Sequence, residues 1–245
     1  MNNITKVFRS ALAASAFTLF PALHAAILTS GHGDLGIGYE DGELEPHWHL
    51  GEDNEVVVID GTPQNDPAGF EFTAAEITPQ TNLAQVRQLG SQWNFIGVAA
   101  GASFYVFPQT SNPNVPFLGI GTEELVAADW STDLTLTLTG ATGPGQFSLY
   151  TESLSTPTEL MSTFDGITAG DAVSVAAGTH THYNWAFTQE GTYSLTFDVS
   201  GTHAVDGFKT ATETFTFSVV PEPSSAGLLL GGAGLFFTFV RRRRA

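Results

Sequence analysis

The stretch GTYSLTFDVSG, residues 191–201, and the stretch TATETFTFSVV, residues 210–220, decide the fold class of this chain. In both stretches apolar or aromatic residues alternate with polar ones. Such alternation is typical of β-strands, because successive side chains of a strand point to opposite faces. A short loop that carries His203 separates the two stretches. We therefore expect two paired strands at this end of the chain.

The same pattern recurs throughout the preceding sequence. Further alternating or β-branched runs are EVVVID (55–60), GFEFTA (69–74), ASFYVF (102–107), DLTLTLTG (133–140), GQFSLYT (145–151) and DAVSVAAG (171–178). Turn-forming residues separate these runs, as in DGTPQNDPAG (60–69), PQTSNPNVP (108–116) and GATGPG (140–145). A helical pattern is confined to TNLAQVRQLG (81–90), and a turn is expected in TEELVAADW (122–130). We predict an all-β fold, a single antiparallel β-sandwich (Ig-like or jelly-roll-like) with one short helix.

The N-terminal 25 residues have the pattern of a secretory signal peptide. Lys6 and Arg9 precede the apolar run ALAASAFTLF, and Pro21 and small residues follow, so cleavage is expected after Ala25 or Ala26. The apolar run is too short for a transmembrane helix. The folded domain is then expected to occupy residues 26–220, with a sorting segment in residues 221–245.

The sorting segment has three parts in a fixed order. These are a Pro-Glu-Pro motif, an apolar run of 15 residues and a basic cluster, comprising Pro221, Glu222 and Pro223, residues 226–240, and Arg241, Arg242, Arg243 and Arg244. At about 1.5 Å per residue the apolar helix falls short of a hydrocarbon core of roughly 30 Å. The arginines hold this end on the cytoplasmic side of the membrane.

This order of parts closely resembles the PEP-CTERM sorting signal of Gram-negative bacteria. The resemblance implies transient insertion of the apolar helix into the inner membrane and recognition by an exosortase. It further implies removal of the tail near Pro221–Pro223 and release to, or attachment at, the cell surface. A plain tail anchor is the alternative interpretation.

The expected mature domain is strongly acidic. Residues 26–220 contain two basic residues, Arg87 and Lys209, against 24 acidic ones, a net charge of −22. Such a surface repels nucleic acid and anionic membranes, which argues against both as partners, and it suits a solvated extracellular protein or one that collects cations. Since the chain has no Cys, packing rather than disulfides must stabilise it.

Histidines gather in three short motifs. In THTHYNWAF, residues 179–187, a continuous strand would place Tyr183, Trp185 and Phe187 on a core face and His180, His182 and Asn184 on the opposite face. In ELEPHWHL, residues 43–50, His47 and His49 lie opposite Leu44, Trp48 and Leu50, and Pro46 indicates an edge or irregular strand. The third motif is GHGD, with His32 and Asp34.

These residues are candidate metal ligands. Imidazole and carboxylate groups together suit zinc best, with manganese, iron, nickel or copper as alternatives. If the motifs meet in the fold, the ligands of one site are His180, His182, His47, His49, His32 and Asp34. The alternative is that the histidines only hydrogen-bond within the sheet or respond to acid at the surface. His203 is interpreted as an ordinary loop residue.

Three blocks of the chain also resemble a known domain. They are FIGVAAGASFYVFPQTSNPNVPFLGIGTEEL, LTLTLTGATGPGQFSLYT and GTHTHYNWAFTQEGTYSLTFDVSG, preceded by LTSGHGDLGIGYEDGELE. Together they resemble the choice-of-anchor M domain of bacterial surface proteins over residues 27–220, although Phe117 stands where a Trp is expected. The resemblance implies no enzymatic activity, and its occurrence beside metal-type ABC transporter components implies a role in handling metal ions.

The leading interpretation is therefore a non-enzymatic surface protein that binds a divalent metal, with a metal transporter as one expected partner. A structural or adhesive component of an exopolysaccharide matrix is the first alternative. A glycan-binding module with Trp93, Trp130, Phe104 and Tyr105 as its platform is the second. The acidic stretches DGELE (41–45) and GEDNE (51–55) do not follow the spacing of a calcium loop, so they are interpreted as solvated loops. No Gly-x-Ser-x-Gly or HExxH motif is present.

Overall fold

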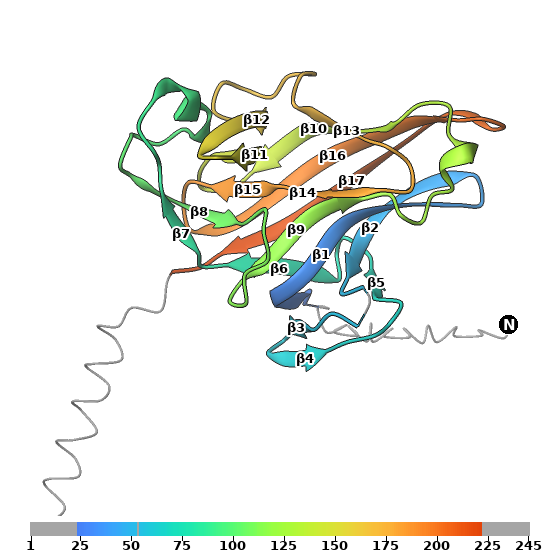
Figure 1. Ribbon diagram of the computed structural model, residues 1–245, viewed down its shortest axis with the longest axis horizontal. Coiled ribbons are helices and arrows are strands. Elements are labelled where there is room, and N and C mark those ends of the chain that lie inside the picture. The colour runs from blue at the N-terminus through green and yellow to red at the C-terminus, as the bar shows by residue number, and fades with distance from the viewer. Residues whose placement is uncertain (1–23, 53, 222–245) are drawn as a thin grey trace, which may run out of the picture.

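The computed structural model describes residues 24–52 and 54–221, which form a β-sandwich (Figure 1). This confirms the predicted fold class. The expected signal peptide up to residue 23 and the expected apolar sorting helix lie outside the described residues. Within the described part of the chain, no helix is long and apolar enough to cross a membrane.

The larger sheet contains twelve strands. Its main path runs β13-β10-β16-β17-β6-β1-β2-β5, while β9 and β14 join it at one side of β1 and β3 and β4 at another. The bounds of these strands are β1 Ala26–Glu40, β2 Glu43–Leu50, β3 Val57–Ile59, β4 Thr62–Gln64, β5 Phe70–Phe72, β6 Ile77–Thr81, β9 Pro116–Gly121, β10 Leu134–Thr142, β13 Ala172–Val175, β14 His180–His182, β16 Gly191–His203 and β17 Gly207–Val219.

The smaller sheet contains five strands in the order β12-β11-β15-β8-β7. Its strands are β7 Ala84–Val86, β8 Ser103–Phe107, β11 Phe147–Ser153, β12 Thr156–Ser162 and β15 Asn184–Phe187. Two short 3-10 helices complete the described elements, η1 Ser91–Ile96 and η2 Ala127–Asp129.

Two details of the predicted fold are wrong. The sheets are mixed rather than purely antiparallel, because β1 pairs in parallel with β6 and β9, and β17 pairs in parallel with β6. The expected helix over residues 81–90 is instead the short edge strand β7, which pairs with β8. Its backbone hydrogen bonds to β8 outweigh the weak helical propensity of the segment. The turn expected in residues 122–130 is confirmed as η2.

The strand pair that decides the fold class carries the centre of the core. β16 and β17 pair over their whole length, from Gly191↔Val219 to His203↔Gly207. Phe217 of β17 is fully buried, and its ring lies 5.4 Å from Trp185 and 6.0 Å from Phe107 of the smaller sheet. On the other side Phe217 lies 5.8 Å from Trp48 of β2. One aromatic side chain therefore links both sheets.

The smaller sheet is buried on both of its faces. Trp185 and Phe187 of β15 point into the main core, whereas Ala186, between them, belongs to a second cluster. The aromatic side chains Trp93 and Phe95 of η1 cover this second cluster. Because both faces are covered, β15 has a fixed position between the core and η1.

β1 takes part in two different regions of the larger sheet. Its first residues pair with β3 and β6, and its second half pairs with β2 and β9. The change occurs near Gly31, whose φ of 104° favours glycine. A Cβ at Gly31 would also lie 2.7 Å from the carbonyl oxygen of Val56. This glycine lets β1 turn so that His32 and Asp34 lie between β2 and β9.

We expect the Phe217→Ala substitution to lower the free energy of unfolding by about 3–5 kcal/mol, because it opens a cavity between the two sheets. Phe208→Ala is the matched control, since Phe208 lies on the same strand but is 70% exposed. The control should change stability by about 0.5 kcal/mol or less. Urea unfolding measures both values. Equal losses for the two variants would contradict the linking role of Phe217.

Candidate metal centre

The predicted histidine motifs meet on one face of four adjacent strands, β2, β1, β9 and β14. The pairing register places His49, Asp34, Gly119 and His182 in one row across these strands. The next row consists of His47, Gly36, Gly121 and His180. The opposite face of the same strands carries core residues, including Leu35, Trp48, Leu118 and Ile120. The alternation predicted for β2 is therefore confirmed.

Glycines on β9 and β1 leave room for these side chains. A Cβ at Gly119 would collide with Asp34 Oδ1, and a Cβ at Gly121 would lie 3.1 Å from Asp34 Oδ2. On β1, a Cβ at Gly36 would lie 2.8 Å from His47 Nε2. The side chains of Asp34 and His47 thus occupy the space above Gly36, Gly119 and Gly121.

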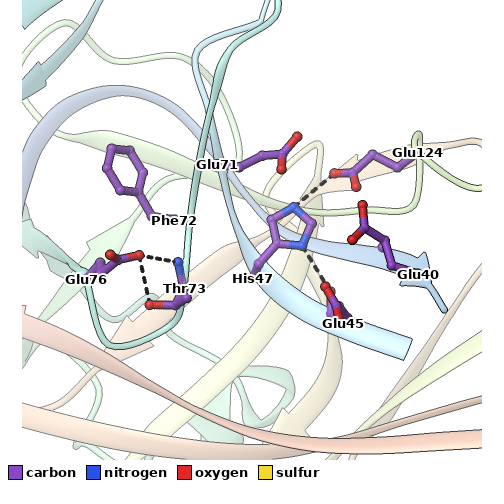
Figure 2. A pocket seen from close by; sticks show the side chains of 9 residues that line it. Glu40, Glu45, His47, Glu71, Phe72, Thr73, Glu76 and Glu124 are labelled. Carbon is purple, nitrogen blue, oxygen red and sulfur yellow. Dashed lines mark hydrogen bonds and ion pairs between the residues drawn. The ribbon is translucent and has the colours of Figure 1, made fainter. Parts of the chain in front are cut away.

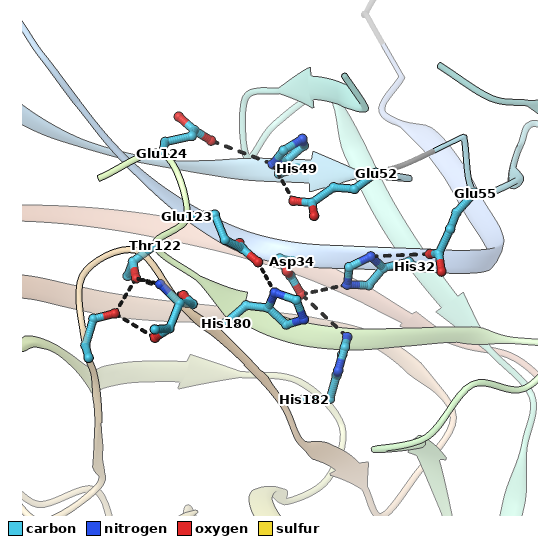
Figure 3. Close-up of polar contacts among 12 residues, drawn as sticks. His32, Asp34, His49, Glu52, Glu55, Thr122, Glu123, Glu124, His180 and His182 are labelled. Atoms are coloured by element: carbon cyan, nitrogen blue, oxygen red, sulfur yellow. Dashed lines mark hydrogen bonds and ion pairs between the residues drawn. The ribbon is translucent and has the colours of Figure 1, made fainter. Parts of the chain in front are cut away.

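Asp34 is the most unusual group on this face. It is only 1% exposed, and neither of its carboxylate oxygens accepts a hydrogen bond. Leaving a buried carboxylate without a hydrogen bond is strongly unfavourable unless a charged group compensates it. Figure 3 shows that three imidazoles surround it. Asp34 therefore requires a positively charged partner.

The three imidazoles come from two strands. His32 Nε2 lies 3.3 Å and His182 Nε2 lies 4.0 Å from Asp34 Oδ1, and neither nitrogen has a hydrogen-bond partner. The ring centroids of His32 and His182 lie 4.8 Å apart, and those of His180 and His182 lie 5.1 Å apart. Rings at this spacing can direct nitrogen atoms to one ion.

Two groups of candidate ligands share this location. The first is His32, His180 and His182, and the second is Asp34, Glu123 and His180. Within each group one ligand atom from every residue lies within 4.8 Å of the others. We call these five residues together the Asp34 centre. The Asp34 centre combines three imidazoles with two carboxylates above the glycines of β9.

The pKa values in the Asp34 centre favour a neutral imidazole at His182. Burial, together with the neighbouring His32 and His180 and against the opposing effect of Asp34, lowers the pKa of His182 to about 4. For His32, burial also acts to lower the pKa, but Asp34 and then Glu55 and Glu52 outweigh it and raise the pKa. Neutral imidazole is the form that binds a metal. His182 favours that form, whereas a metal ion would have to displace a proton from His32.

A buried threonine fixes the two loops that carry Glu123 and His180. Thr122 is fully buried, and its hydroxyl lies 2.7 Å from the carbonyl oxygen of Ala176 and 2.8 Å from that of Thr179. The backbone of Thr122 also bonds to Thr179 and Gly178. The side chain of Glu123 then contacts Nδ1 of His180 directly (Figure 3). Glu123 is positioned either to bind an ion itself or to orient His180.

His47 and His49 lie on the same face but outside the Asp34 centre. His47 Nε2 lies 2.9 Å from Glu124 Oε1, and His49 Nδ1 lies 3.3 Å from Glu52 Oε1. Among the described residues, neither histidine belongs to a group with three ligand atoms within 4.8 Å of one another. Of the six predicted ligands, the structure therefore brings His32, Asp34, His180 and His182 together and leaves His47 and His49 beside them.

The motif THTHYNWAF is not one continuous strand. β14 ends at His182 in the larger sheet, and β15 begins at Asn184 in the smaller one. Tyr183 and Trp185 are buried in the core as predicted. The prediction that Asn184 shares the face of the histidines is wrong, because its Oδ1 accepts a hydrogen bond from the backbone N–H of Gln109.

Several acidic residues of this face were not predicted as part of a site. Glu52 and Glu55 lie in GEDNE, which we interpreted as a solvated loop, yet they lie beside His49 and His32. Glu123 and Glu124 lie in the expected turn, which is short and acidic like many surface turns. The two consecutive glutamates follow Thr122 after the strand PFLGIG, and nothing in this short acidic stretch distinguishes a site residue from a solvated turn.

Other sequence predictions concern residues away from this face. His203 packs between Tyr39 and Trp130 at the opposite end of β1, with ring centroids 4.8 and 5.4 Å away, and accepts a hydrogen bond from the backbone of Asp206. The suggested glycan platform is wrong in part, because Trp93 is 3% and Phe104 is 1% exposed. Neither ring can stack on a sugar.

We expect Gly119→Ala to disturb the Asp34 centre while leaving the fold intact, because the new Cβ forces the Asp34 carboxylate away. The cost should be about 1–3 kcal/mol of unfolding free energy, as for other overpacking substitutions. Gly140→Ala on β10 is the control, since its Cβ would meet Thr196 at an ordinary 3.4 Å. Urea unfolding with near-ultraviolet circular dichroism tests this expectation, and equal stability of the two variants would contradict it.

Comparison with known proteins identifies one segment of the chain. Residues 219–244 match the PEP-CTERM protein-sorting motif. No curated protein and no solved structure matches the chain. The match supports processing by an exosortase and export to the cell surface or beyond. It begins at the last residue of β17, so this sorting motif directly follows the domain.

Proposed function

We propose that this protein is a non-enzymatic, exosortase-sorted extracellular protein that binds one divalent transition-metal ion in the Asp34 centre. The observation that carries the proposal is the buried Asp34 carboxylate, which has no hydrogen bond and faces three imidazoles. A divalent ion would supply the charge that Asp34 needs and would use the unpartnered nitrogens of His32 and His182.

Zinc fits this set of ligands best. Three imidazoles and one carboxylate provide the four nitrogen and oxygen ligands of a tetrahedral zinc site. Glu123 could add a fifth ligand, which would also suit manganese, iron or nickel. His180 and His182 are partly exposed, with side-chain exposures of 35% and 23%, so the ion would reach the centre from the side of β14.

Capture of metal at the cell surface is the role that this site supports. The Asp34 centre is small, and it lies within a domain whose net charge attracts cations. The resemblance to the choice-of-anchor M domain points in the same direction, with a metal transporter as the partner that would receive the ion. Metal capture of this kind requires neither a catalysed reaction nor a bound substrate.

A structural role in an extracellular matrix is the second candidate. The observation in its favour is that His180 and His47 contact carboxylates, Glu123 and Glu124, directly. In that case the histidines would only fix the loops of the sheet. Stability would then be indifferent to zinc and to chelators.

A zinc titration of the purified protein distinguishes the two candidates. At a zinc concentration of 100 times Kd, binding to the native state should raise the unfolding free energy by about 2.7 kcal/mol. A chelator should reverse the gain. His180→Ala together with His182→Ala should abolish most of it, because two ligands are lost. An unchanged unfolding midpoint of the wild type across micromolar zinc would refute metal binding.

Asp34→Asn gives the sharper test of the buried carboxylate. The substitution keeps the shape of the side chain but removes its negative charge. Without metal, the variant should be at least as stable as the wild type, because a neutral amide costs less to bury than an unpartnered carboxylate. It should nevertheless lose the stabilisation by zinc. Asp198→Asn serves as the control, since Asp198 lies on β16 and accepts a hydrogen bond from Thr212. If the Asp34→Asn variant were still stabilised by zinc, that result would count against the proposal.

A further inference from the structure

A second set of metal-ligating side chains lies next to the Asp34 centre. The turn after β9 carries two consecutive glutamates, and while Glu123 belongs to the Asp34 centre, Glu124 points to β2. Glu124 Oε1 lies 2.9 Å from His47 Nε2 and 3.8 Å from His49 Nδ1. Figure 2 shows His47 directed at Glu124, and Figure 3 shows His49 between Glu124 and Glu52.

Backbone carbonyls fix the orientation of both imidazoles. His47 Nδ1 lies 3.0 Å from the carbonyl oxygen of Glu45, and His49 Nε2 lies 3.2 Å from that of Ala68. A carbonyl oxygen only accepts hydrogen bonds, so each of these nitrogens carries the proton. In a neutral imidazole the other nitrogen then has a lone pair. For both residues that second nitrogen faces a carboxylate.

The carbonyl contacts of the two imidazoles are those of metal ligands, and Glu124 forms an ion pair with His47 that a metal ion could replace. Histidines that bind a metal usually donate their second N–H to a carbonyl or carboxylate, as His47 and His49 do. The 2.9 Å between His47 Nε2 and Glu124 Oε1 is a hydrogen-bond distance, so a metal ion bound there would take the place of the shared proton.

Among the described residues, no Lys or Arg side chain neutralises these carboxylates. A cavity of about 280 Å³ adjoins His47, and carboxylates line most of it: Glu40, Glu45, Glu71, Glu76 and Glu124 (Figure 2). The two basic residues between positions 26 and 220 are engaged elsewhere. Lys209 donates to the carbonyl oxygen of Gly42, and Arg87 donates to Trp93, Gly90 and Asn94. A cation could reach His47 through this cavity, because carboxylates line it.

Glycines keep this space open as they do in the Asp34 centre. A Cβ at Gly36 would lie 2.8 Å from His47 Nε2, and one at Gly38 would lie 3.0 Å from Glu124 Oε2. The ring centroids of His47 and His49 are 6.4 Å apart, compared with 4.8 to 5.7 Å in the Asp34 centre. Binding would therefore draw the two rings closer together around Glu124.

We propose that His47, His49 and Glu124 form a second site for a divalent transition-metal ion, with Glu52 as an adjacent carboxylate. The site shares no ligand with the Asp34 centre, so it goes beyond the function proposed above and does not depend on it. The consecutive residues Glu123 and Glu124 connect the two sites. The protein would then hold two ions on one face.

Zinc stoichiometry of paired variants tests this proposal. The purified wild-type protein should bind two zinc ions per chain in a calorimetric titration confirmed by elemental analysis. His47→Ala with His49→Ala should bind one ion, and His180→Ala with His182→Ala should also bind one. His203→Ala is the matched control and should still bind two, because His203 lies at the other end of β1. Circular dichroism verifies that each variant is folded.

Each result assigns the sites separately. The second site would be overturned if the His47→Ala, His49→Ala variant still bound two ions. It would also be overturned if the wild type bound one ion and this variant still bound it. If that variant alone loses zinc, the second site stands and the Asp34 centre fails. Glu124→Gln is a conservative second test, and it should weaken one of the two binding events at least about tenfold. Glu213→Gln on β17 should leave both events unchanged, and an equal effect of the two substitutions would also overturn the second site.

Discussion

Burial of Trp185 between the two sheets is the interaction on which the metal-ligand face depends. The Trp185 ring is fully buried, stacks on Phe217 at 5.4 Å and donates from Nε1 to the carbonyl oxygen of Leu118. The backbone N–H of Tyr183 bonds to the same carbonyl oxygen. Because Leu118 lies on β9, these contacts hold the chain where it crosses from the larger to the smaller sheet. The residues just before the crossing must then lie along β9, which brings His180 and His182 to Asp34.

The composition of β9 explains why a polar cluster can be buried on the outer face of a sheet. Leu118 and Ile120 of PFLGIG point to the core, whereas Phe117, Gly119 and Gly121 lie on the outer face, where Phe117 stacks on His32 and the two glycines add no side chain. Imidazoles from β14 and a carboxylate from β1 occupy that space. A β-sandwich normally exposes polar groups on this face to water. Because Gly119 and Gly121 have no side chains, the Asp34 carboxylate packs against β9 and is as buried as a core leucine.

The sequence predicts the parts of the fold that depend on local alternation, and it predicts less where distant pairing decides. Alternation in β2, β16 and β17 identifies their core faces correctly, because a strand with one buried face repeats every two residues. The parallel pairing of β1 with β6 and β9 has no local signature. Nor does the sequence mark the crossing at Tyr183, because both halves of THTHYNWAF fit one continuous alternation. For the candidate site, His32, Asp34, His180 and His182 can be recognised from residue type and spacing. The contribution of Glu123 is not, since an acidic turn looks the same whether it faces water or an imidazole.

The absence of disulfides gives the proposed metal sites a structural consequence. β14 has three residues, pairs with β9 on one side only, and is tied to the rest of the sheet by few bonds. An ion bound by His32 and by His180 would join two segments that lie far apart in the sequence. A link of this kind removes conformational freedom from the unfolded chain much as a disulfide does, and the effect grows with the length of the closed loop. Repulsion among the 24 acidic residues of the domain acts in the opposite direction. A protein that leaves the cell with no cysteine and little positive charge would thus gain both charge compensation and a cross-link from the same ion, so capture of metal and stability of the domain would be coupled.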